Sequence, residues 1–215
     1  MKTILYFQEM NKNALIIFQK NEIPGKVKTR LAASIGDESA LKIYRILIQH
    51  THSILKEIVA DQFIFYSDFI PEIRIESGRI VHERIQTGKD LGERMRNAFE
   101  TVFSEGYDHV VIIGTDCVDL KPAHIQKAFK KLSQNDAVLG PALDGGYYLL
   151  GLKKLIPEIF EEIDWSTNQV LNQTKSKLQE LNFSIGIIDT LSDIDNIADW
   201  EKVKGRFDSE LNSKH

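Results

Sequence analysis

Short apolar runs alternate with longer amphipathic segments along this chain, and that alternation limits the folds it can adopt. The apolar runs occupy residues 14–18, 63–66, 110–113, 137–139 and 183–188. They are rich in β-branched and aromatic side chains and are bounded by polar residues or glycine, which is typical of buried strands. The sequence therefore predicts five short, buried strands.

The segments between these runs carry apolar residues at helical spacing. Residues 40–58, 91–103 and 122–132 repeat apolar positions every three or four residues, which predicts a helix in each. Pro122 suits the first turn of its helix. Ser166 and Gln169 have the spacing of a capping box, which predicts a further helix that continues to about residue 181.

Strands that alternate with helices predict an α/β fold, a three-layer α/β/α sandwich with a mostly parallel sheet. The length of 215 residues and the lack of a linker-like stretch predict one domain over residues 1–215, with its core in residues 14–200. Ligands of such sheets bind beyond the carboxyl ends of the strands. Residues that directly follow a predicted strand are therefore the candidates for chemistry.

Composition argues against several classes of protein. Lys and Arg number 27 against 31 Asp and Glu, a net charge of −4, which argues against nucleic-acid binding by bulk positive charge. Cys117 is the only cysteine, so an intrachain disulfide and a multi-cysteine zinc site are excluded. No apolar run is long enough to span a membrane, and none has the pattern of a signal peptide. We expect a cytoplasmic protein whose partners are small molecules.

The first predicted strand leads into a cationic loop at residues 20–31. Pro24 and Gly25 turn the chain there, and the loop holds four cations and one anion: Lys20, Lys26, Lys28, Arg30 and Glu22. Free backbone N–H groups at a helix start, together with cations, suit a diphosphate or triphosphate. The loop is neither a Walker A motif nor a G-x-G-x-x-G fingerprint. A solvated charged loop is the alternative.

Two carboxylates follow the most apolar strand, in the segment GTDCVDL at residues 114–120. At the end of a strand, Asp116 and Asp119 can hold Mg²⁺ or Mn²⁺, which takes one or two carboxylates plus substrate phosphates. The alternative is that one of them caps the helix that begins near Pro122. We expect Asp116 to be the ligand and Asp119 the cap. We expect Cys117 to be a buried packing residue, because no adjacent His or Lys favours a thiolate.

The segment GPALDGGYYLLG at residues 140–151 follows another strand. Asp144 supplies a carboxylate, and Gly145 and Gly146 allow a positive φ or the close approach of a ligand to the backbone. Tyr147 or Tyr148 can stack on, or hydrogen-bond to, a sugar or base. A tight turn that leads into a strand, with one buried tyrosine, is the alternative.

Two more carboxylates, Asp193 and Asp195, follow the last predicted strand. They lie two residues apart, so one of them can face the ligand edge of the sheet. The alternative is that Asp195 or Asn196 caps a helix.

Taken together and in this order, these segments resemble the GT-A-like nucleotide-diphospho-sugar transferase superfamily. Within it the chain is similar to the bacterial group described as rSAM/selenodomain-associated transferases, a glycosyltransferase-like domain of unknown function. The resemblance covers about residues 14–200 and is carried by six motifs: PGKVKTRL at 24–31, DLGERM at 90–95, GTDCVDL at 114–120, GPALDGGYYLLG at 140–151, WST at 165–167 and DIDNIAD at 193–199.

The resemblance implies roles for residues that match these motifs. It implies that the first loop grips the nucleotide phosphates through Lys28, Thr29 and Arg30, a set to which we add Lys20. It implies that Asp116 binds the divalent metal and that Asp195 completes the metal site. It also implies that Asp144, Gly145 and Gly146 border the sugar or the acceptor, a set to which we add Tyr147.

This chain departs from the group's pattern where two prolines shape loops. Val118 replaces the proline of GTDCPDL, while Asn196 and Ile197 replace Thr-Pro in the last motif. The carboxylates are retained at both places. The departures therefore affect the loops that shape the metal site and leave its ligands in place.

The resemblance implies transfer of a glycosyl group from a nucleotide-diphosphate sugar, with Mg²⁺ or Mn²⁺ and with Asp144 as base or acceptor-orienting group. A nucleotidyltransferase that joins a nucleoside triphosphate to a phosphorylated small molecule uses the same fold and similar residues. Those enzymes usually have a glycine-rich first loop, whereas this loop has one glycine. A non-catalytic nucleotide-binding module is the third alternative, and the retained carboxylates argue against it.

Overall fold

The computed structural model describes residues 12–72, 81–207 and 211 and contains one seven-stranded sheet. Its strands are β1 (Asn13–Gln19), β2 (Asp61–Tyr66), β3 (Val81–Ile85), β4 (His109–Ile113), β5 (Ala137–Pro141), β6 (Tyr147–Leu152) and β7 (Ile185–Ile187). Their order across the sheet is β3-β2-β1-β4-β6-β5-β7. The five predicted strands are confirmed in β1, β2, β4, β5 and β7.

The sheet is mostly parallel, as expected. β6 alone among these seven strands runs antiparallel to its neighbours, β4 and β5. Its first residue, Tyr147, therefore lies at the edge where the parallel strands end. The reversed direction of β6 brings the preceding segment at residues 144–146 to that same edge.

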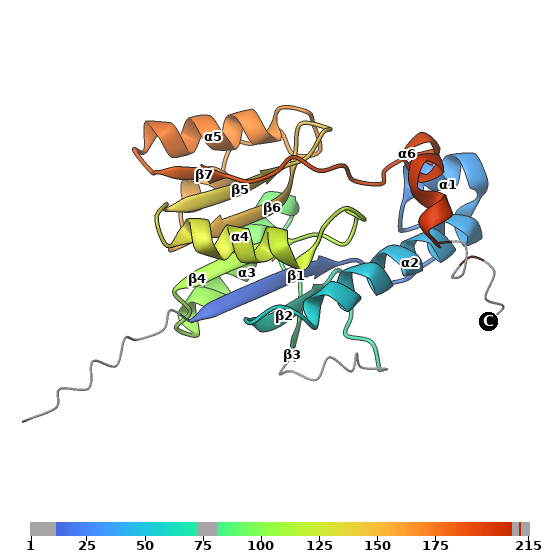
Figure 1. Cartoon of the computed structure of the whole chain (residues 1–215), viewed down its shortest axis with the longest axis horizontal. Helices are drawn as coiled ribbons and strands as arrows, with labels where there is room; N and C mark the ends of the chain where they lie inside the picture. The colour runs from blue at the N-terminus through green and yellow to red at the C-terminus, as the bar shows by residue number, and fades with distance from the viewer. Residues whose placement is uncertain (1–11, 73–80, 208–210, 212–215) are drawn as a thin grey trace, which may run out of the picture.

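Helices cover both faces of the sheet, which confirms the three-layer architecture (Figure 1). They are α1 (Thr29–Ile35), α2 (Asp37–Leu55), α3 (Leu91–Ser104), α4 (Pro122–Leu132), α5 (Val170–Glu180) and α6 (Ile197–Val203), with short 3₁₀ helices η1 (Pro157–Phe160) and η2 (Lys204–Phe207). α3, η1 and α5 pack on one face, while α4 and the C-terminal half of α2 pack on the other. In the described part of the chain, no helix is both long and apolar enough to cross a membrane.

Alternation along the strands explains the two layers of core. In β1, Ala14 and Ile16 contact the α3 side, whereas Leu15 and Ile17 contact the α2 and α4 side, and all four are fully buried. A sheet buried on both faces needs apolar side chains at every position, because successive side chains point to opposite faces.

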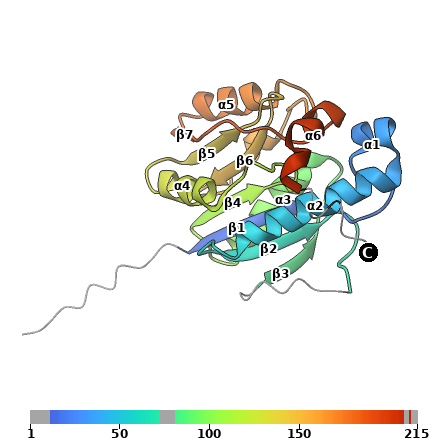
Figure 2. The same cartoon turned by 45° about the vertical axis from the view of Figure 1, so that its right-hand side comes forward.

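A separate apolar cluster lies beyond the carboxyl ends of the strands. It joins α1 and the N-terminal half of α2 to α6 and η2, and its largest buried side chain is Trp200. Figure 2 shows α6 crossing back toward α1 and α2 after the chain has left β7. This return places residues 193–195 beside loops from the first half of the chain.

Two predictions about helix starts are wrong. α5 begins at Val170, and its N-cap, Gln169, makes no side-chain capping bond, so Ser166 and Gln169 form no capping box. The N-cap of α4 is Lys121; Asp119 instead accepts a hydrogen bond of 2.6 Å from Arg206 Nη1. Each of these side chains lies in a loop, and tertiary contacts determine the path of that loop.

Candidate active site

A cavity of about 770 Å³ opens at the carboxyl edge of the sheet. A volume of several hundred Å³ is typical of small-molecule sites. Its walls include all but one of the residues to which the sequence assigned a role: Lys20, Lys28, Thr29, Arg30, Asp116, Asp144, Gly146, Tyr147 and Asp195. Gly145 is not part of the wall. The fold thus brings together segments that lie far apart in the sequence.

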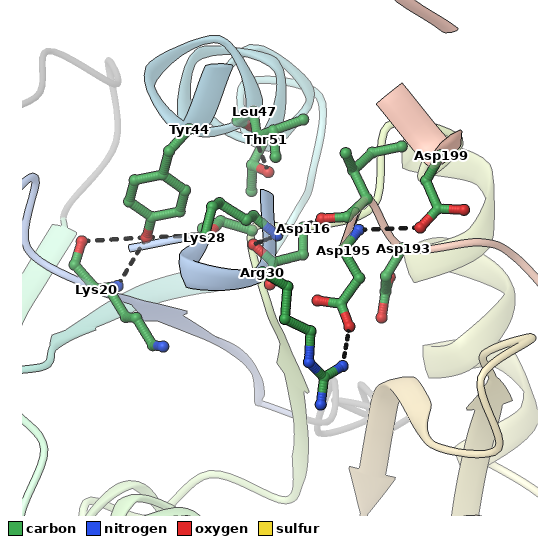
Figure 3. A network of polar contacts seen from close by, with 12 residues as sticks. Lys20, Lys28, Arg30, Tyr44, Leu47, Thr51, Asp116, Asp193, Asp195 and Asp199 are labelled. Atoms are coloured by element: carbon green, nitrogen blue, oxygen red, sulfur yellow. Dashed lines mark hydrogen bonds and ion pairs between the residues drawn. The ribbon is translucent and has the colours of Figure 1, made fainter. Parts of the chain in front are cut away.

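Lys28 connects three of the loops around this cavity. Its Nζ lies 2.8 Å from Asp116 Oδ1 and donates a 2.6 Å hydrogen bond to the backbone oxygen of Ile194 (Figure 3). The Lys28 side chain is only 4% exposed, and its backbone is left-handed, with φ 48°, at the N-cap of α1. The ammonium therefore faces a carboxylate and a carbonyl of the protein itself.

The other cations of the first loop are more exposed. Arg30 Nη1 lies 2.5 Å from Asp195 Oδ2, with the arginine side chain 69% exposed. Thr29 begins α1 at the cavity wall. Within the described residues, the Lys20 ammonium makes no ion pair or hydrogen bond, and in Figure 3 the dashed lines at Lys20 run from its backbone to the Tyr44 hydroxyl. Lys20 and Arg30 therefore offer positive charge near the cavity mouth.

Tyr44 of α2 holds the start of the first loop. Its buried hydroxyl accepts a 2.9 Å bond from the Lys20 N–H and donates a 3.1 Å bond to the Lys20 backbone oxygen. Thr115, next to Asp116, donates to the same hydroxyl at 3.4 Å. Burial raises the pKa of Tyr44, so the group stays neutral and serves to position both loops. Sequence reasoning placed Tyr44 only on the helix.

Asp193 is the carboxylate whose charge the structure couples most clearly to Asp116. Burial and, after it, the charge of Asp116 raise the pKa of Asp193 to about 7, against the opposing effect of Lys28. Asp195, the residue that the sequence assigned to the metal, instead pairs with Arg30. The chain path that separates them is fixed at Ile194, whose N–H donates to the Asp116 backbone oxygen at 2.9 Å.

The donor set suits a divalent cation held in part by substrate. No group of three or more His, Cys, Asp or Glu side chains among the described residues is arranged to hold a metal ion. Asp116 and Asp193 provide two hard oxygen ligands, and Mg²⁺ is commonly bound by one or two carboxylates plus substrate phosphates and water. Mutual repulsion of these carboxylates also favours a cation between them. The residues therefore fit Mg²⁺ or Mn²⁺.

The turn at Asp144 is shaped by its glycines. Asp144 Oδ1 accepts a 2.9 Å bond from the Gly146 N–H, which leaves the exposed carboxylate at the cavity wall. Gly145 has φ 90°, and a Cβ added there would lie 2.3 Å from the backbone oxygen of Asn168. The positive φ expected for this glycine pair is confirmed at Gly145.

Tyr147 contributes its ring to the wall, while its hydroxyl points elsewhere. The hydroxyl is buried near Thr174 of α5, and burial raises the pKa of Tyr147. A hydrogen bond from this hydroxyl to a ligand is therefore not available in this arrangement. Contact with a sugar or acceptor can come only from the ring.

The sequence did not assign a role to Trp165, which lines the cavity on the α3 side. The half-buried indole packs directly on Gly92 in the first turn of α3, where an added Cβ would lie 2.3 Å from Trp165 Nε1. Leu91 and Met95 lie on the same wall. The pairing of DLGERM with WST among the motifs was the signal that could have indicated this contact.

The residues around the carboxylates pack as small apolar groups. Cys117 is 5% exposed, and burial raises the pKa of its thiol to about 12, which confirms the predicted packing role. Val118, at the position of the missing proline, is buried against Ile194 and Trp200. Asn196 caps α6 by accepting from the Asp199 N–H, as the helix-capping alternative for this residue predicted.

Comparison with known proteins gives a match to a family and a similar solved structure. The sequence profile of a family described as "Uncharacterized protein conserved in bacteria (DUF2064)" matches residues 51–167. A crystal structure from Desulfovibrio desulfuricans G20, described as a "putative nucleotide-diphospho-sugar transferase", is 32% identical, with a TM-score of 0.82 over 95% of this chain and 90% of that one. No curated protein matches the chain.

More distant structures share the fold alone. CMP:2-keto-3-deoxy-manno-octonic acid synthetase complexed with CTP is 13% identical, with a TM-score of 0.56 over 93% of this chain and 100% of that one. The inositol-1-phosphate CTP transferase from T. maritima is 15% identical, with a TM-score of 0.55 over 97% and 100%. The chain therefore has a fold found in nucleotidyl and sugar transferases.

Proposed function

The chain belongs to the DUF2064 family of bacterial proteins, and we propose that it transfers a glycosyl group from a nucleotide-diphosphate sugar to a small-molecule acceptor. The observation that carries the proposal is the cavity in which the cations of the first loop meet carboxylates from the segments after β4 and β7. The 32% identical relative, described as a "putative nucleotide-diphospho-sugar transferase", supports the choice of donor.

In the proposed reaction an acceptor hydroxyl oxygen forms a bond to the anomeric carbon of the sugar. The bond between that carbon and the β-phosphate oxygen breaks, and its electron pair leaves with the nucleoside diphosphate. Asp144, an exposed carboxylate at the cavity wall, receives the hydroxyl proton. Lys20, Lys28 and Arg30 neutralise the departing diphosphate, and the start of α1 at Thr29 offers free N–H groups to it.

We propose Asp116 and Asp193 as the carboxylates that hold Mg²⁺ or Mn²⁺. When bound, the ion would stabilise negative charge on the leaving diphosphate. The sequence favoured Asp195 as the partner of Asp116, but it is the pKa of Asp193 that the charge of Asp116 raises, while Asp195 pairs with the exposed Arg30. With a nucleoside diphosphate present, we expect Asp116→Asn and Asp193→Asn to weaken Mn²⁺ binding about tenfold or more in calorimetry, and Asp195→Asn to weaken it less. Equal losses for Asp193→Asn and Asp195→Asn would contradict this choice of ligands.

The direct test is a donor screen. The protein is incubated with UDP-, GDP-, CDP- and dTDP-sugars, Mn²⁺ and a set of small hydroxyl acceptors, and the release of nucleoside diphosphate is followed by ³¹P NMR and mass spectrometry. Asp144→Asn should keep donor affinity and lose most turnover, because it removes the proposed proton acceptor. If no nucleotide or nucleotide sugar binds with or without metal, the proposal is wrong.

Nucleotidyl transfer is the second candidate, because the CTP-using proteins named above share the fold. Here a phosphate oxygen of the acceptor would attack the α-phosphorus of a nucleoside triphosphate and expel pyrophosphate. The same screen with nucleoside triphosphates separates the two reactions, since only this one releases pyrophosphate. Nucleotide binding without any turnover would instead indicate a non-catalytic binding module.

A further inference from the structure

We propose that Lys28 makes cation binding depend on diphosphate binding. In this proposal its ammonium neutralises Asp116 while the cavity lacks a diphosphate, and transfers to the diphosphate when one binds. The inference rests on the proposed function in two respects: the cavity accepts a diphosphate, and Asp116 binds the divalent cation. According to this inference, Lys28 makes the site bind the diphosphate before it binds the cation.

The ion pairs around the cavity carry the argument. Lys28 Nζ lies 2.8 Å from Asp116 Oδ1, and its side chain is 4% exposed, so little water competes for the ammonium. Arg30 is paired in the same way with Asp195 at 2.5 Å. Each of these two carboxylates therefore has a cation of the protein beside it. Lys20, by contrast, has no charged partner in the described part of the chain.

A divalent cation that approaches Asp116 meets the ammonium of Lys28 at hydrogen-bonding distance from the same carboxylate. Two positive charges beside one carboxylate repel each other, and the 4% exposed ammonium is screened by little water, although the Asp116 side chain is 45% exposed. Because Lys28 already neutralises Asp116, this carboxylate attracts the cation only weakly. The ammonium of Lys28 also repels the cation. We therefore expect Mn²⁺ alone to bind weakly to the wild-type protein.

A diphosphate reverses both effects. Its oxygens accept charge-assisted hydrogen bonds from Lys28, which frees Asp116. The same oxygens supply the cation with ligands that two carboxylates cannot provide. Because coupling between two binding sites is reciprocal, the cation must then strengthen diphosphate binding by the same factor as the diphosphate strengthens cation binding.

The test compares Lys28→Met with wild type in two separate titrations. Calorimetry at pH 8 measures the affinity for Mn²⁺ alone and, in EDTA, the affinity for inorganic pyrophosphate alone, so that chelation of Mn²⁺ by pyrophosphate does not interfere. We expect Lys28→Met to bind Mn²⁺ about tenfold tighter than wild type, within the range of typical coupling factors. We expect it to bind pyrophosphate about tenfold more weakly.

Lys20→Met is the matched control, because it removes the same charge from the same loop without releasing a carboxylate. Its Mn²⁺ affinity should stay within about threefold of wild type. Lys28→Gln serves if Lys28→Met does not fold, since glutamine removes the charge and keeps an N–H donor on a side chain one bond shorter.

The outcomes distinguish this inference from the proposed function. Unchanged Mn²⁺ affinity in the Lys28 variants, or an equal gain in Lys20→Met, overturns the role of Lys28. Failure of wild-type protein to bind pyrophosphate, nucleotide or nucleotide sugar under any metal condition overturns the proposed function instead. A gain in Mn²⁺ affinity confined to the Lys28 variants, together with their loss of pyrophosphate binding, supports both.

Discussion

Gly145 carries two separate constraints, a positive φ and a lack of space for a side chain. Both Gly145 (φ 90°) and Gly106 (φ 83°) have left-handed backbones, but an added Cβ would contact nothing within 4 Å at Gly106 and would meet Asn168 at Gly145. We expect Gly106→Ala to cost about 1 kcal/mol from backbone strain alone. Gly145→Ala should cost about 2–4 kcal/mol, because the chain at Asn168 must also move.

Chemical unfolding of the two variants measures the difference. The cavity of Gly145→Ala should also bind nucleotide more weakly, since residues 144 and 168 both line it. An equal loss of unfolding free energy in the two variants would show that the chain at Asn168 moves aside at no cost in free energy.

His52 gives the fold a pH dependence on the acid side. Burial lowers its pKa from 6.5 to about 4, and its Nε2 lies 2.8 Å from Gln19 Oε1. As the pH falls, His52 is therefore protonated near pH 6.5 in the unfolded chain but only near pH 4 in the folded chain. Stability should fall as the pH drops through that interval, by about 2 kcal/mol, after allowance for the partial exposure of the ring.

Urea unfolding at pH 7, 6, 5 and 4 tests this expectation against His52→Gln. The difference in unfolding free energy between wild type and variant should change in favour of the variant as the pH falls. A difference that is constant with pH would show that His52 titrates normally in the folded state.

The sequence could name the carboxylates of the site but could not choose between Asp193 and Asp195. Side chains two residues apart share a face only in a regular strand, and residues 193–195 form none. Their directions follow from the bonds at Ile194, one to the Asp116 backbone and one from Lys28. Those partners lie far away in the sequence, so no local pattern reports them.

The buried strand β4 could be predicted from its sequence, whereas the edge strand β3 could not. All five residues of β4 are buried, and its apolar run is unambiguous. β3 reads VHERI, is only half-buried at the edge of the sheet, and lacks a continuous apolar run. The direction of β6 was equally hidden, because a buried antiparallel strand and a buried parallel strand have the same apolar composition.

α3 contains a position at which the usual helix preference should reverse. Replacing a helical glycine with alanine ordinarily stabilises a helix by about 0.5–1 kcal/mol. At Gly92 the added methyl would overlap the indole of Trp165, so we expect Gly92→Ala to destabilise the protein by about 1–3 kcal/mol. Thermal unfolding, with tryptophan fluorescence as a second readout, measures the effect.

A double variant isolates the cause. In a Trp165→Ala background the overlap is gone, and Gly92→Ala should be neutral or stabilising. If Gly92→Ala lowers the unfolding free energy equally in wild type and in Trp165→Ala, the strain lies elsewhere in α3.

At the scale of the whole molecule, the alternation of strands and helices was enough to predict the architecture and the edge that holds the cavity. It was not enough to predict the cluster of α1, α2, α6 and η2, because its contacts join residues 31–47 to residues 194–207. Trp200 is the centre of that cluster, and its ring stacks on Phe207 at 5.8 Å between centroids.

Trp200→Ala should therefore affect both stability and the site. Loss of this buried side chain should cost about 3–5 kcal/mol. Because Val118 and Ile194 belong to the same cluster, Mn²⁺ affinity in the presence of nucleotide should fall as well. Trp200→Phe, which keeps an aromatic ring, should retain most of both properties. A stability loss without any change in cation affinity would show that residues 193–195 hold their position independently.

The late position of Asp193 in the chain has a consequence for the protein as it is made. The ribosome adds Asp193 only 77 residues after Asp116, which takes roughly 4–15 seconds at typical synthesis rates. Until that segment emerges, the nascent chain can pair β1, β2 and β4 yet has no second carboxylate beside Asp116. We therefore expect ribosome-bound intermediates to remain unable to capture metal and nucleotide together until Asp193 has emerged.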